Sequence, residues 1–404
     1  MNGRSSTRLG LLGASLVGLV LTACGATSSP TRAQLRQLPD PTWTASPVVS
    51  ATATQLVSAV IELLPSVVAP VVPTPGASST STPLPSSTLS AQPRLRQLSS
   101  GGCCSQPFWS SDSRYVQFID RPASRPLGIY GVDIERPGSP ILVSEWVVTT
   151  SSGGDFYVYP DGNTTVVQHA ASGEKHVITN GGRPVSVSPD GQRLLWQVID
   201  RRGDFDKRRS QIYVANVDGS NPRVVGETIG LGWSEWIDSQ GILLVGLPLK
   251  DQSLVSIATL TLGAENRDDQ LLELVQVYRP QETLISPRGS WLVYLLTFQV
   301  DPNDDGLWLV RTDGSRPPHK LDFFGSFHWR DDTHLLYVPL ELDVDSHTLW
   351  EYDVIGDASQ RLTDPAQIPF KIANNDWTVS PNGRYVAFVN AADHNLWLID
   401  LGMQ

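Results

Sequence analysis

In the second part of the chain, apolar and polar residues alternate over short runs that turn-forming residues separate. The runs are rich in β-branched and aromatic side chains, as at residues 194–196, 291–294 and 385–388. Alternation with a period of two is typical of half-buried β-strands, and helical spacing is almost absent from this part of the chain. Residues 268–278 are also predicted to form a strand. The pattern therefore predicts an all-β domain over residues 93–404.

A turn of the type Ser-Pro-Asp-Gly precedes many of these runs. Proline presets φ at the second turn position, and glycine accepts the left-handed fourth position, so the motif closes a tight hairpin. A second turn, of the type Asp-Gly-Ser, follows at residues 218–220 and 313–315. Each full unit then has four short strands joined by tight turns, which is typical of one β-propeller blade. Three clear copies of the first turn lie at 188–191, 286–289 and 380–383, and four weaker copies lie at 110–113, 159–162, 236–241 and 329–332.

The seven copies of this hairpin favour seven four-stranded antiparallel blades. The interval from Gly162 to Gly191 is short, so six blades are the alternative. After the last hairpin, residues 396–401 leave the final blade one strand short, and residues 95–98 have the pattern of the missing strand. We therefore expect an N-terminal strand to close the ring, because closure pairs both chain ends and removes an open sheet edge.

The N-terminus has the pattern of a lipoprotein signal peptide. Arg4 and Arg8 precede an apolar stretch over residues 9–21 that is short for a membrane span. Leu-Thr-Ala-Cys at residues 21–24 resembles the lipobox of bacterial lipoproteins, in which the cysteine thiol takes a diacylglyceryl group. We therefore predict a signal peptide at residues 1–23, a lipid on Cys24, and an extracytoplasmic protein that is anchored to a bacterial membrane.

Residues 24–92 are rich in Ser, Thr and Pro and bury too little apolar surface to offset the entropy of ordering, so they are predicted to form a disordered linker. The whole chain has a net charge of -11, and the first 100 residues are net positive, so the charge of the propeller is more negative still. Such an acidic domain is unsuited to a phosphate backbone, which excludes nucleic acid as the expected partner. We expect a monomer.

The repeats resemble the blades of the TolB-like β-propeller family, which carry the same two turns. The resemblance covers residues 93–402 and implies a propeller that serves as a binding platform. In the family's namesake the propeller docks a peptidoglycan-associated lipoprotein. This chain lacks the namesake's N-terminal α/β domain and has its own lipobox, so only the class of partner follows, an envelope protein or a cell-wall component.

Short catalytic motifs are absent from the sequence, which has no G-x-S-x-G, H-E-x-x-H, C-x-x-C or P-loop pattern. We therefore expect a protein- or ligand-binding scaffold at the cell envelope that is not an enzyme. The alternative is a propeller hydrolase or cofactor-dependent oxidase with its active site in the central funnel.

One candidate metal site lies before Gly306. Asp301, Asn303 and Asp305 place oxygen side chains at alternating positions, as in the first half of a calcium loop. Thr312 stands where the second half would supply a bidentate glutamate, so a solvated acidic turn is the alternative. Calcium is the one cofactor that the sequence indicates.

A basic loop at residues 201–209 is the other candidate, because it concentrates cations in an acidic domain. We expect it to join the second and third strands of its blade, at the same edge of the ring as residues 301–306 and the adjacent Cys103 and Cys104. These two thiols form either a strained vicinal disulfide or a pair of free thiols. The candidate binding residues of the basic loop are Arg201, Arg202, Phe205, Lys207, Arg208 and Arg209.

Overall fold

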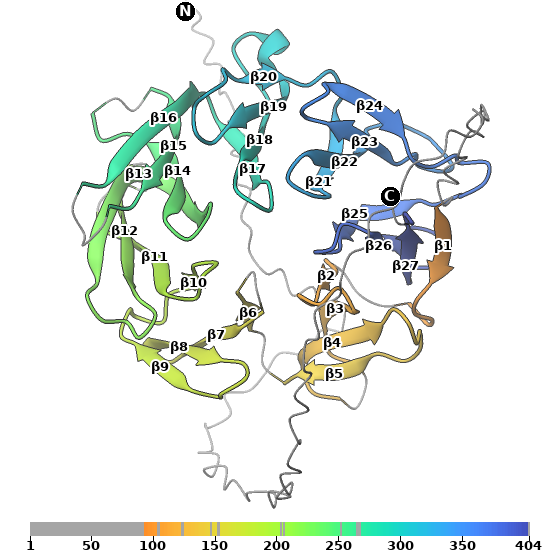
Figure 1. Ribbon diagram of the computed structural model, residues 1–404, viewed down its shortest axis with the longest axis horizontal. Helices are drawn as coiled ribbons and strands as arrows, with labels where there is room; N and C mark the ends of the chain where they lie inside the picture. Colours follow the sequence, from red (N-terminus) through yellow and green to blue (C-terminus); the bar gives the residue numbers. More distant parts are fainter. Residues whose placement is uncertain are drawn as a thin grey trace, which may run out of the picture. The chain divides into compact units, whose positions relative to one another are not determined.

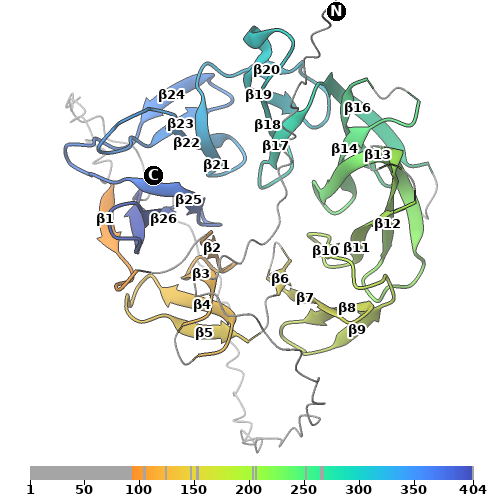
Figure 2. The same cartoon turned by 180° about the vertical axis from the view of Figure 1, so that it is seen from behind.

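The structure is a computed structural model, and it describes residues 93–102, 106–122, 125–145, 148–151, 154–202, 204, 207–250, 253–263 and 268–402. Its strands form six antiparallel sheets that are arranged as a ring, which Figures 1 and 2 show from its two faces. The structure is therefore the all-β propeller that the sequence predicts. A short 3-10 helix, η3 (Pro302–Asp304), lies between two strands.

Five of the sheets have four strands each, and one end strand of each sheet lies nearest the centre of the ring (Figure 1). These sheets contain, in order from the centre outward, β2 (Phe108–Trp109), β3 (Tyr115–Asp120), β4 (Gly128–Asp133) and β5 (Ile141–Ser144); β6 (Thr149–Thr150), β7 (Phe156–Asp161), β8 (Thr164–His169) and β9 (Lys175–Ile178); β17 (Pro280–Ile285), β18 (Trp291–Leu296), β19 (Gly306–Arg311) and β20 (His319–Lys320); β21 (Gly325–Trp329), β22 (His334–Pro339), β23 (Trp350–Asp353) and β24 (Ala358–Arg361); and β25 (Ile372–Val379), β26 (Tyr385–Asn390), β27 (Leu396–Asp400) and β1 (Arg94–Gln97).

The other strands form one seven-stranded sheet because β13 is shared by two groups of strands. Residues before Ile229 pair with β12, residues from Trp233 pair with β14, and the register shifts between these two residues. The prediction of seven or six separate four-stranded blades is therefore wrong, since five blades have four strands and this sheet is continuous. Its strands are β10 (Val185–Val187), β11 (Arg193–Ile199), β12 (Arg209–Asn216), β13 (Arg223–Trp236), β14 (Gly241–Leu247), β15 (Val255–Thr261) and β16 (Gln270–Val277).

The serine of the repeated turn has a role that the sequence pattern did not reveal. The Ser188 hydroxyl oxygen accepts a hydrogen bond from the backbone N–H of Arg193 at 2.9 Å, and the Gly191 N–H donates to the Ser188 carbonyl at 2.9 Å. The hydroxyl therefore ties the start of the turn to the strand that leaves it. The same hydroxyl bond recurs at Ser110, Ser151, Ser286 and Ser380.

The second sheet differs from the prediction. Residues 159–162 were expected to form its first hairpin, but they join β7 to β8, which are its second and third strands. The first hairpin is at Ser151, where the hydroxyl accepts from the Phe156 N–H at 3.1 Å. This explains the short interval from Gly162 to Gly191, because the two glycines belong to different turns of their blades.

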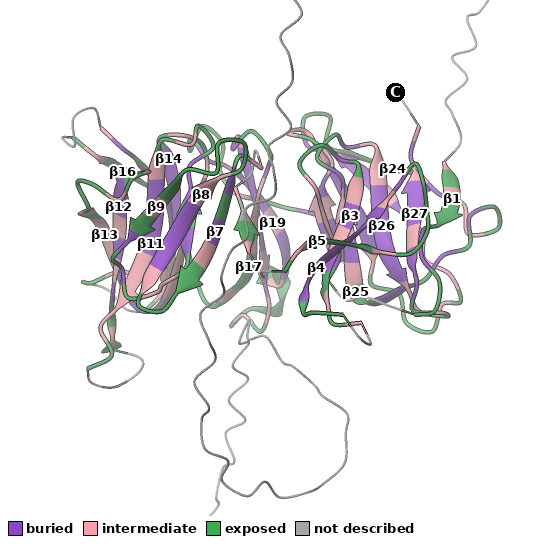
Figure 3. Ribbon diagram, turned by 90° about the horizontal axis from the view of Figure 1, so that it is seen from below, coloured by how far each residue is buried: buried purple, intermediate pink, exposed green. Residues whose placement is uncertain are grey.

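Apolar packing between neighbouring sheets holds the ring together. Figure 3 shows buried strands inside each sheet and exposed ones, such as β1, at the outside. One apolar cluster contains Leu307 of β19 and Leu335 of β22, both fully buried. Indole N–H groups add hydrogen bonds between innermost strands, since Trp329 donates to the Leu284 carbonyl at 3.0 Å and Trp236 to the Ser186 carbonyl at 3.3 Å.

The N-terminal strand closes the ring, as predicted. β1 pairs antiparallel with β27, and the Leu98 N–H donates to the Leu396 carbonyl at 2.8 Å. Leu98 is 2% exposed and packs in a cluster that also contains Val116 of the first blade. The two ends of the described chain therefore complete the last blade together.

Candidate functional site

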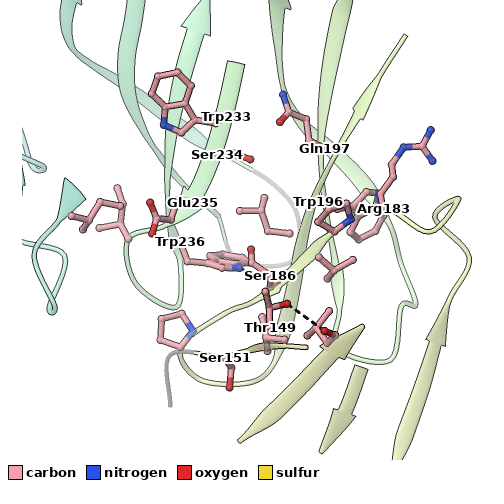
Figure 4. A pocket seen from close by; sticks show the side chains of 18 of the residues that line it. Thr149, Ser151, Arg183, Ser186, Trp196, Gln197, Trp233, Ser234, Glu235 and Trp236 are labelled. Carbon is pink, nitrogen blue, oxygen red and sulfur yellow. Dashed lines mark hydrogen bonds between the residues drawn. The ribbon is translucent and has the colours of Figure 1, made fainter. Parts of the chain in front are cut away.

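A pocket of about 860 Å³ lies among the innermost strands β6, β10 and β17 and the C-terminal half of β13 (Figure 4). We call it the inner pocket. It falls within the range of about 300–1,000 Å³ that is common for sites that bind small ligands. The charged and indole side chains on its wall include Arg183, Trp196, Arg201, Trp233, Glu235 and Trp236.

The tryptophans of the inner pocket are held in fixed positions by the neighbouring strands. Because side chains alternate along a strand, Trp233 and Trp236 of β13 lie on opposite faces. The Trp233 indole N–H donates to the Thr283 hydroxyl of β17 at 3.0 Å. On the opposite face of β13, the Trp236 indole N–H donates to the Ser186 carbonyl of β10. Trp196 of β11 stacks on Tyr213 with ring centroids 5.5 Å apart. The aromatic wall is therefore rigid before any ligand arrives.

Glu235 lies between these two tryptophans and lines the inner pocket. Its side chain is exposed at the wall of the pocket, and the surrounding protein atoms replace part of the water that would solvate a charge. This desolvation raises the pKa of the Glu235 carboxyl above its usual range. A carboxyl with a raised pKa can hold a proton at mildly acidic pH and release it to a base, so Glu235 is a candidate acid or base.

Other titratable groups on innermost strands are shifted in the same direction. Burial raises the pKa of Glu282 on β17 and of Asp376 on β25, and it lowers the pKa of His328 on β21 to about 4. In all of these cases the neutral form is favoured. Successive inner strands of the ring thus carry titratable groups whose charged forms are disfavoured by desolvation.

Polar groups complete the wall of the inner pocket. The Gln197 side-chain amide donates to the Gly232 carbonyl at 2.8 Å, which holds it beside the bend of β13. The Arg183 guanidinium donates to the Asn180 carbonyl, and Arg201 stands exposed where β11 ends. The pocket therefore offers cations and amide groups next to aromatic faces.

The basic loop joins β11 to β12, as expected, but among its described candidate residues only Arg201 lines the inner pocket. The Arg202 guanidinium lies 2.8 Å from the Asp200 carboxylate, and it lowers the pKa of that carboxyl to about 2. Lys207 lies 3.2 Å from Asp204. The two remaining described cations are Arg209, which is 3.9 Å from Glu227, and Arg208, which is also in contact with other groups.

In the acidic loop, the oxygens proposed for calcium hold the loop itself. The Asp301 carboxylate accepts from the Asn303 N–H at 2.9 Å, and Asp305 accepts from the Gln299 N–H at 2.8 Å. The Lys320 ammonium donates to the Asn303 carbonyl. Across the described ranges, no three His, Cys, Asp or Glu side chains gather closely enough to hold a metal ion. Calcium binding stays a prediction.

Several predicted residues lie outside the described ranges. These are the lipidation residue Cys24, the pair Cys103 and Cys104, and Phe205 of the basic loop. In the part of the chain that the structure describes, no helix is long and apolar enough to cross a bilayer.

The sequence pattern did not single out Trp233, Glu235 or Gln197. Trp236 was noted only as part of a degenerate turn. The usable signal was the Trp-Ser-Glu-Trp run at residues 233–236, which places a carboxyl between two indoles directly before a first hairpin. Such a position lies on an innermost strand.

No protein-family model and no curated protein matches the sequence. Among solved structures, an oligogalacturonate lyase in complex with manganese has a TM-score of 0.53 at 12% identity, and the match covers 77% of this chain and 98% of that one. Oligogalacturonate lyase from Vibrio parahaemolyticus has a TM-score of 0.52 at 10% identity, with 76% and 97% covered. These likenesses show the β-propeller fold.

A structure provisionally identified as TolB, from Agrobacterium tumefaciens, is 16% identical, with 65% of this chain and 81% of that one covered. Its TM-score of 0.33 is too low to support an argument. Membership of the TolB-like family therefore stays a prediction.

The expectation that the protein is not an enzyme is corrected by these comparisons. It rested on the absence of short catalytic motifs, but both structures named above with TM-scores over 0.5 are lyases. Propeller active sites assemble from side chains on separate blades, so a missing short motif does not exclude one. The fold by itself assigns no activity to this chain.

Proposed function

We propose that the protein binds an acidic oligosaccharide in the inner pocket. One observation carries the proposal: the Trp233 indole of β13 lines the same pocket as two arginines, Arg183 just before β10 and Arg201 just after β11. Each of these groups recognises a different part of such a ligand.

The chemistry of the wall matches a sugar chain that carries carboxylates. The C–H faces of a pyranose ring pack on an indole, whose face is electron-rich. A guanidinium binds a carboxylate through two parallel hydrogen bonds, and such charge-assisted bonds are stronger than neutral ones. The side-chain amide of Gln197 can form hydrogen bonds with the hydroxyl groups of the sugar. Because burial favours the neutral form of Glu235, this carboxyl opposes an anionic ligand less than an ordinary one would.

The fold likeness supports the same class of ligand, since the structures with the higher TM-scores are lyases of oligogalacturonate, an acidic oligosaccharide. A second candidate function is cleavage of that ligand at the same pocket. Glu235 favours it, because a carboxyl whose pKa is raised above its usual range is better suited to hold and transfer a proton than an ordinary one.

The setting that we propose is the cell envelope. The lipobox ending at Cys24 supports a lipid anchor, and the linker at residues 24–92 would let the propeller work away from the bilayer. A cell-wall polysaccharide fragment fits both the expected class of partner and the inner pocket. Within this proposal the protein acts as a monomer and binds no nucleic acid.

The test is calorimetric titration with trigalacturonate and with a neutral trisaccharide. Trp233→Ala and Arg201→Gln should each weaken trigalacturonate binding about tenfold or more, which corresponds to about 1.4 kcal/mol. The matched controls are Trp397→Phe, on the outer part of the last blade, and Arg202→Gln, one residue outside the pocket. Equal affinity for the neutral sugar, or equal losses in the controls, would overturn the proposal.

Cleavage is tested on the same samples by mass spectrometry of the sugar. Product that forms with the native protein, and disappears with Glu235→Gln while binding persists, supports a lyase or hydrolase. Binding without product leaves the pocket as a binding site only.

A further inference from the structure

A second surface lies on the face of the ring at which the second strand of each blade is joined to the third. We call it the rim patch. Because antiparallel strands alternate in direction, the β18–β19 and β22–β23 connections emerge at the same edge as the β20–β21 and β16–β17 connections. The exposed apolar side chains of these four connections are Tyr278, Phe298, Val300, Phe324, Leu340 and Leu342.

Three of these side chains are nearly fully exposed: Phe298 at 85%, Val300 at 95% and Leu342 at 84%. Single exposed apolar residues are ordinary, but several at neighbouring loop tips are typical of an interaction surface. The connections also touch one another, since the Leu340 N–H donates to the Phe324 carbonyl at 2.9 Å. The apolar tips thus belong to one continuous edge.

The loop that carries Phe298 is held in a strained shape. Phe298 has a φ of 57°, a left-handed conformation that is rare for an aromatic residue. The next residue fixes it, because the Gln299 N–H donates to Asp305 at 2.8 Å and its side-chain amide donates to the Tyr278 carbonyl at 2.5 Å. Such strain persists where the surroundings enforce it, and it often marks functional sites. Here it presents the phenyl ring to solvent.

In the β18–β19 and β22–β23 connections the apolar side chains alternate with acidic ones and with no Lys or Arg, whereas the β16–β17 connection carries Arg279, whose guanidinium lies 5.0 Å from the centre of the Tyr278 ring. Residues 297–305 contain Asp301, Asp304 and Asp305, and residues 340–346 contain Glu341, Asp343 and Asp345. The nearest lysines, Lys320 and Lys371, each donate to a backbone carbonyl of these loops. The rim patch is therefore apolar at its tips and negative between them.

We propose that the rim patch docks a basic amphipathic segment of another protein, with apolar side chains flanked by Lys or Arg. Charge complementarity favours this partner over the alternatives. An anionic membrane surface would repel the interleaved carboxylates. A second copy would bring the same negative loops, and Arg202, Lys207, Arg208 and Arg209 of its basic loop contact groups of their own chain.

The proposal is tested with the full-length chain and a synthetic helical peptide that has Leu on one face and Lys on the other. Binding is measured by fluorescence anisotropy at low and at physiological salt. We expect the peptide to bind, to bind more weakly as salt rises, and to lose at least tenfold in affinity with Phe298→Asn combined with Leu342→Ser. The charge variant Glu341→Gln with Asp343→Asn should weaken binding and reduce its dependence on salt.

These variants separate docking from folding. Asn accepts a left-handed φ more readily than Phe, so Phe298→Asn should leave the melting temperature unchanged or higher while binding falls. The control pair, Val177→Ser with Leu271→Ser, removes side chains that are 62% and 65% exposed on outermost strands. It should leave peptide binding intact.

Four results would overturn the proposal. The first three are no binding of the Leu–Lys peptide, equal binding of a Leu–Glu peptide, and equal losses of affinity in the control pair. The fourth is that the variant at Phe298 and Leu342 still binds the peptide but no longer binds vesicles or no longer self-associates. None of these results bears on the inner pocket, which is tested with sugars.

Discussion

At the residue scale, the innermost strands hold side chains whose charge the protein disfavours. Glu235 and His328 lie on β13 and β21, and burial shifts both toward their neutral forms. The two shifts have opposite effects on how stability depends on pH, because one group loses a proton when it becomes charged and the other gains one. Each effect can be measured separately.

Glu235→Gln should make the protein more stable at neutral pH. The pKa of Glu235 is raised in the folded state, so the folded state disfavours the ionised form, and this cost is present at pH 7 and disappears as pH falls below the usual Glu range of about 4.3. Glutamine mimics the neutral acid. We expect the melting temperature to rise on the order of 1 to 2 °C at pH 7 and to match the native protein near pH 4.

The control for this variant is Glu145→Gln, which changes an exposed side chain that does not line the inner pocket. It should not reproduce the pattern. A lower melting temperature for Glu235→Gln at pH 7 would mean that the carboxylate is stabilised by its surroundings, contrary to the raised pKa.

His328 should make the fold sensitive to acid. Its pKa is lowered to about 4, whereas in the unfolded chain a histidine takes up a proton near pH 6.5. Between these values the unfolded state binds a proton that the folded state refuses, so stability is full above about pH 6.5 and falls toward pH 4. His328→Gln should flatten this part of the stability curve, measured by urea unfolding at several pH values. The control is His319→Gln at an exposed histidine, which should keep the pH dependence of the native protein. If His328→Gln also keeps it, His328 is not the source of the acid sensitivity.

At the element scale, the ring depends on β1. The backbone of β1 pairs with β27 over four residues, and Leu98 beyond it is buried against the first blade. A propeller sheet without its outer strand exposes an unpaired edge, which invites aggregation. The short N-terminal strand thus stabilises both the last blade and its junction with the first.

Deleting residues 25–92 should leave the stability of the propeller nearly unchanged, because β1 remains. Extending the deletion to residue 99 removes backbone hydrogen bonds worth about 1 kcal/mol each, together with the buried Leu98. Against a total stability of about 5–15 kcal/mol, the loss should be severe. Calorimetry and light scattering compare the two truncations, and equal melting temperatures with equal solubility would contradict closure by β1.

The sequence predicted many elements correctly because turn chemistry is local. The hairpin at Ser188-Pro189-Asp190-Gly191 is predicted by residues that have strong φ preferences. Strand β1 could be inferred because the last blade lacked one strand. The hairpin at Ser151 was missed because its turn lacks the Pro-Asp pair. The continuous seven-stranded sheet was missed because Gly230 and Gly232 suggest a break, whereas β13 runs through both.

The inner pocket could not be predicted in this way. Its wall comes from β6, β10, β11, β13 and β17, and no single strand supplies it. Whether a strand tryptophan packs between blades, as Trp329 does, or lines a pocket, as Trp233 does, depends on blades that lie far apart in the sequence. Local patterns carry no information on that choice.

At the scale of the whole molecule, the proposed anchor decides where the propeller works. Cys24→Ser should prevent lipid attachment and either release the protein from membranes or leave it unprocessed. Detergent partitioning and incorporation of labelled fatty acid measure this directly, with Cys103→Ser as the control. Unchanged partitioning together with unchanged labelling would refute the lipoprotein interpretation.

We propose the inner pocket as the ligand site, and a crystal structure of the protein with trigalacturonate tests this assignment. We expect a sugar ring against the Trp233 indole, with a carboxylate within hydrogen-bond distance of Arg183 or Arg201. A ligand bound elsewhere on the ring, with the inner pocket empty at saturating sugar, would contradict it.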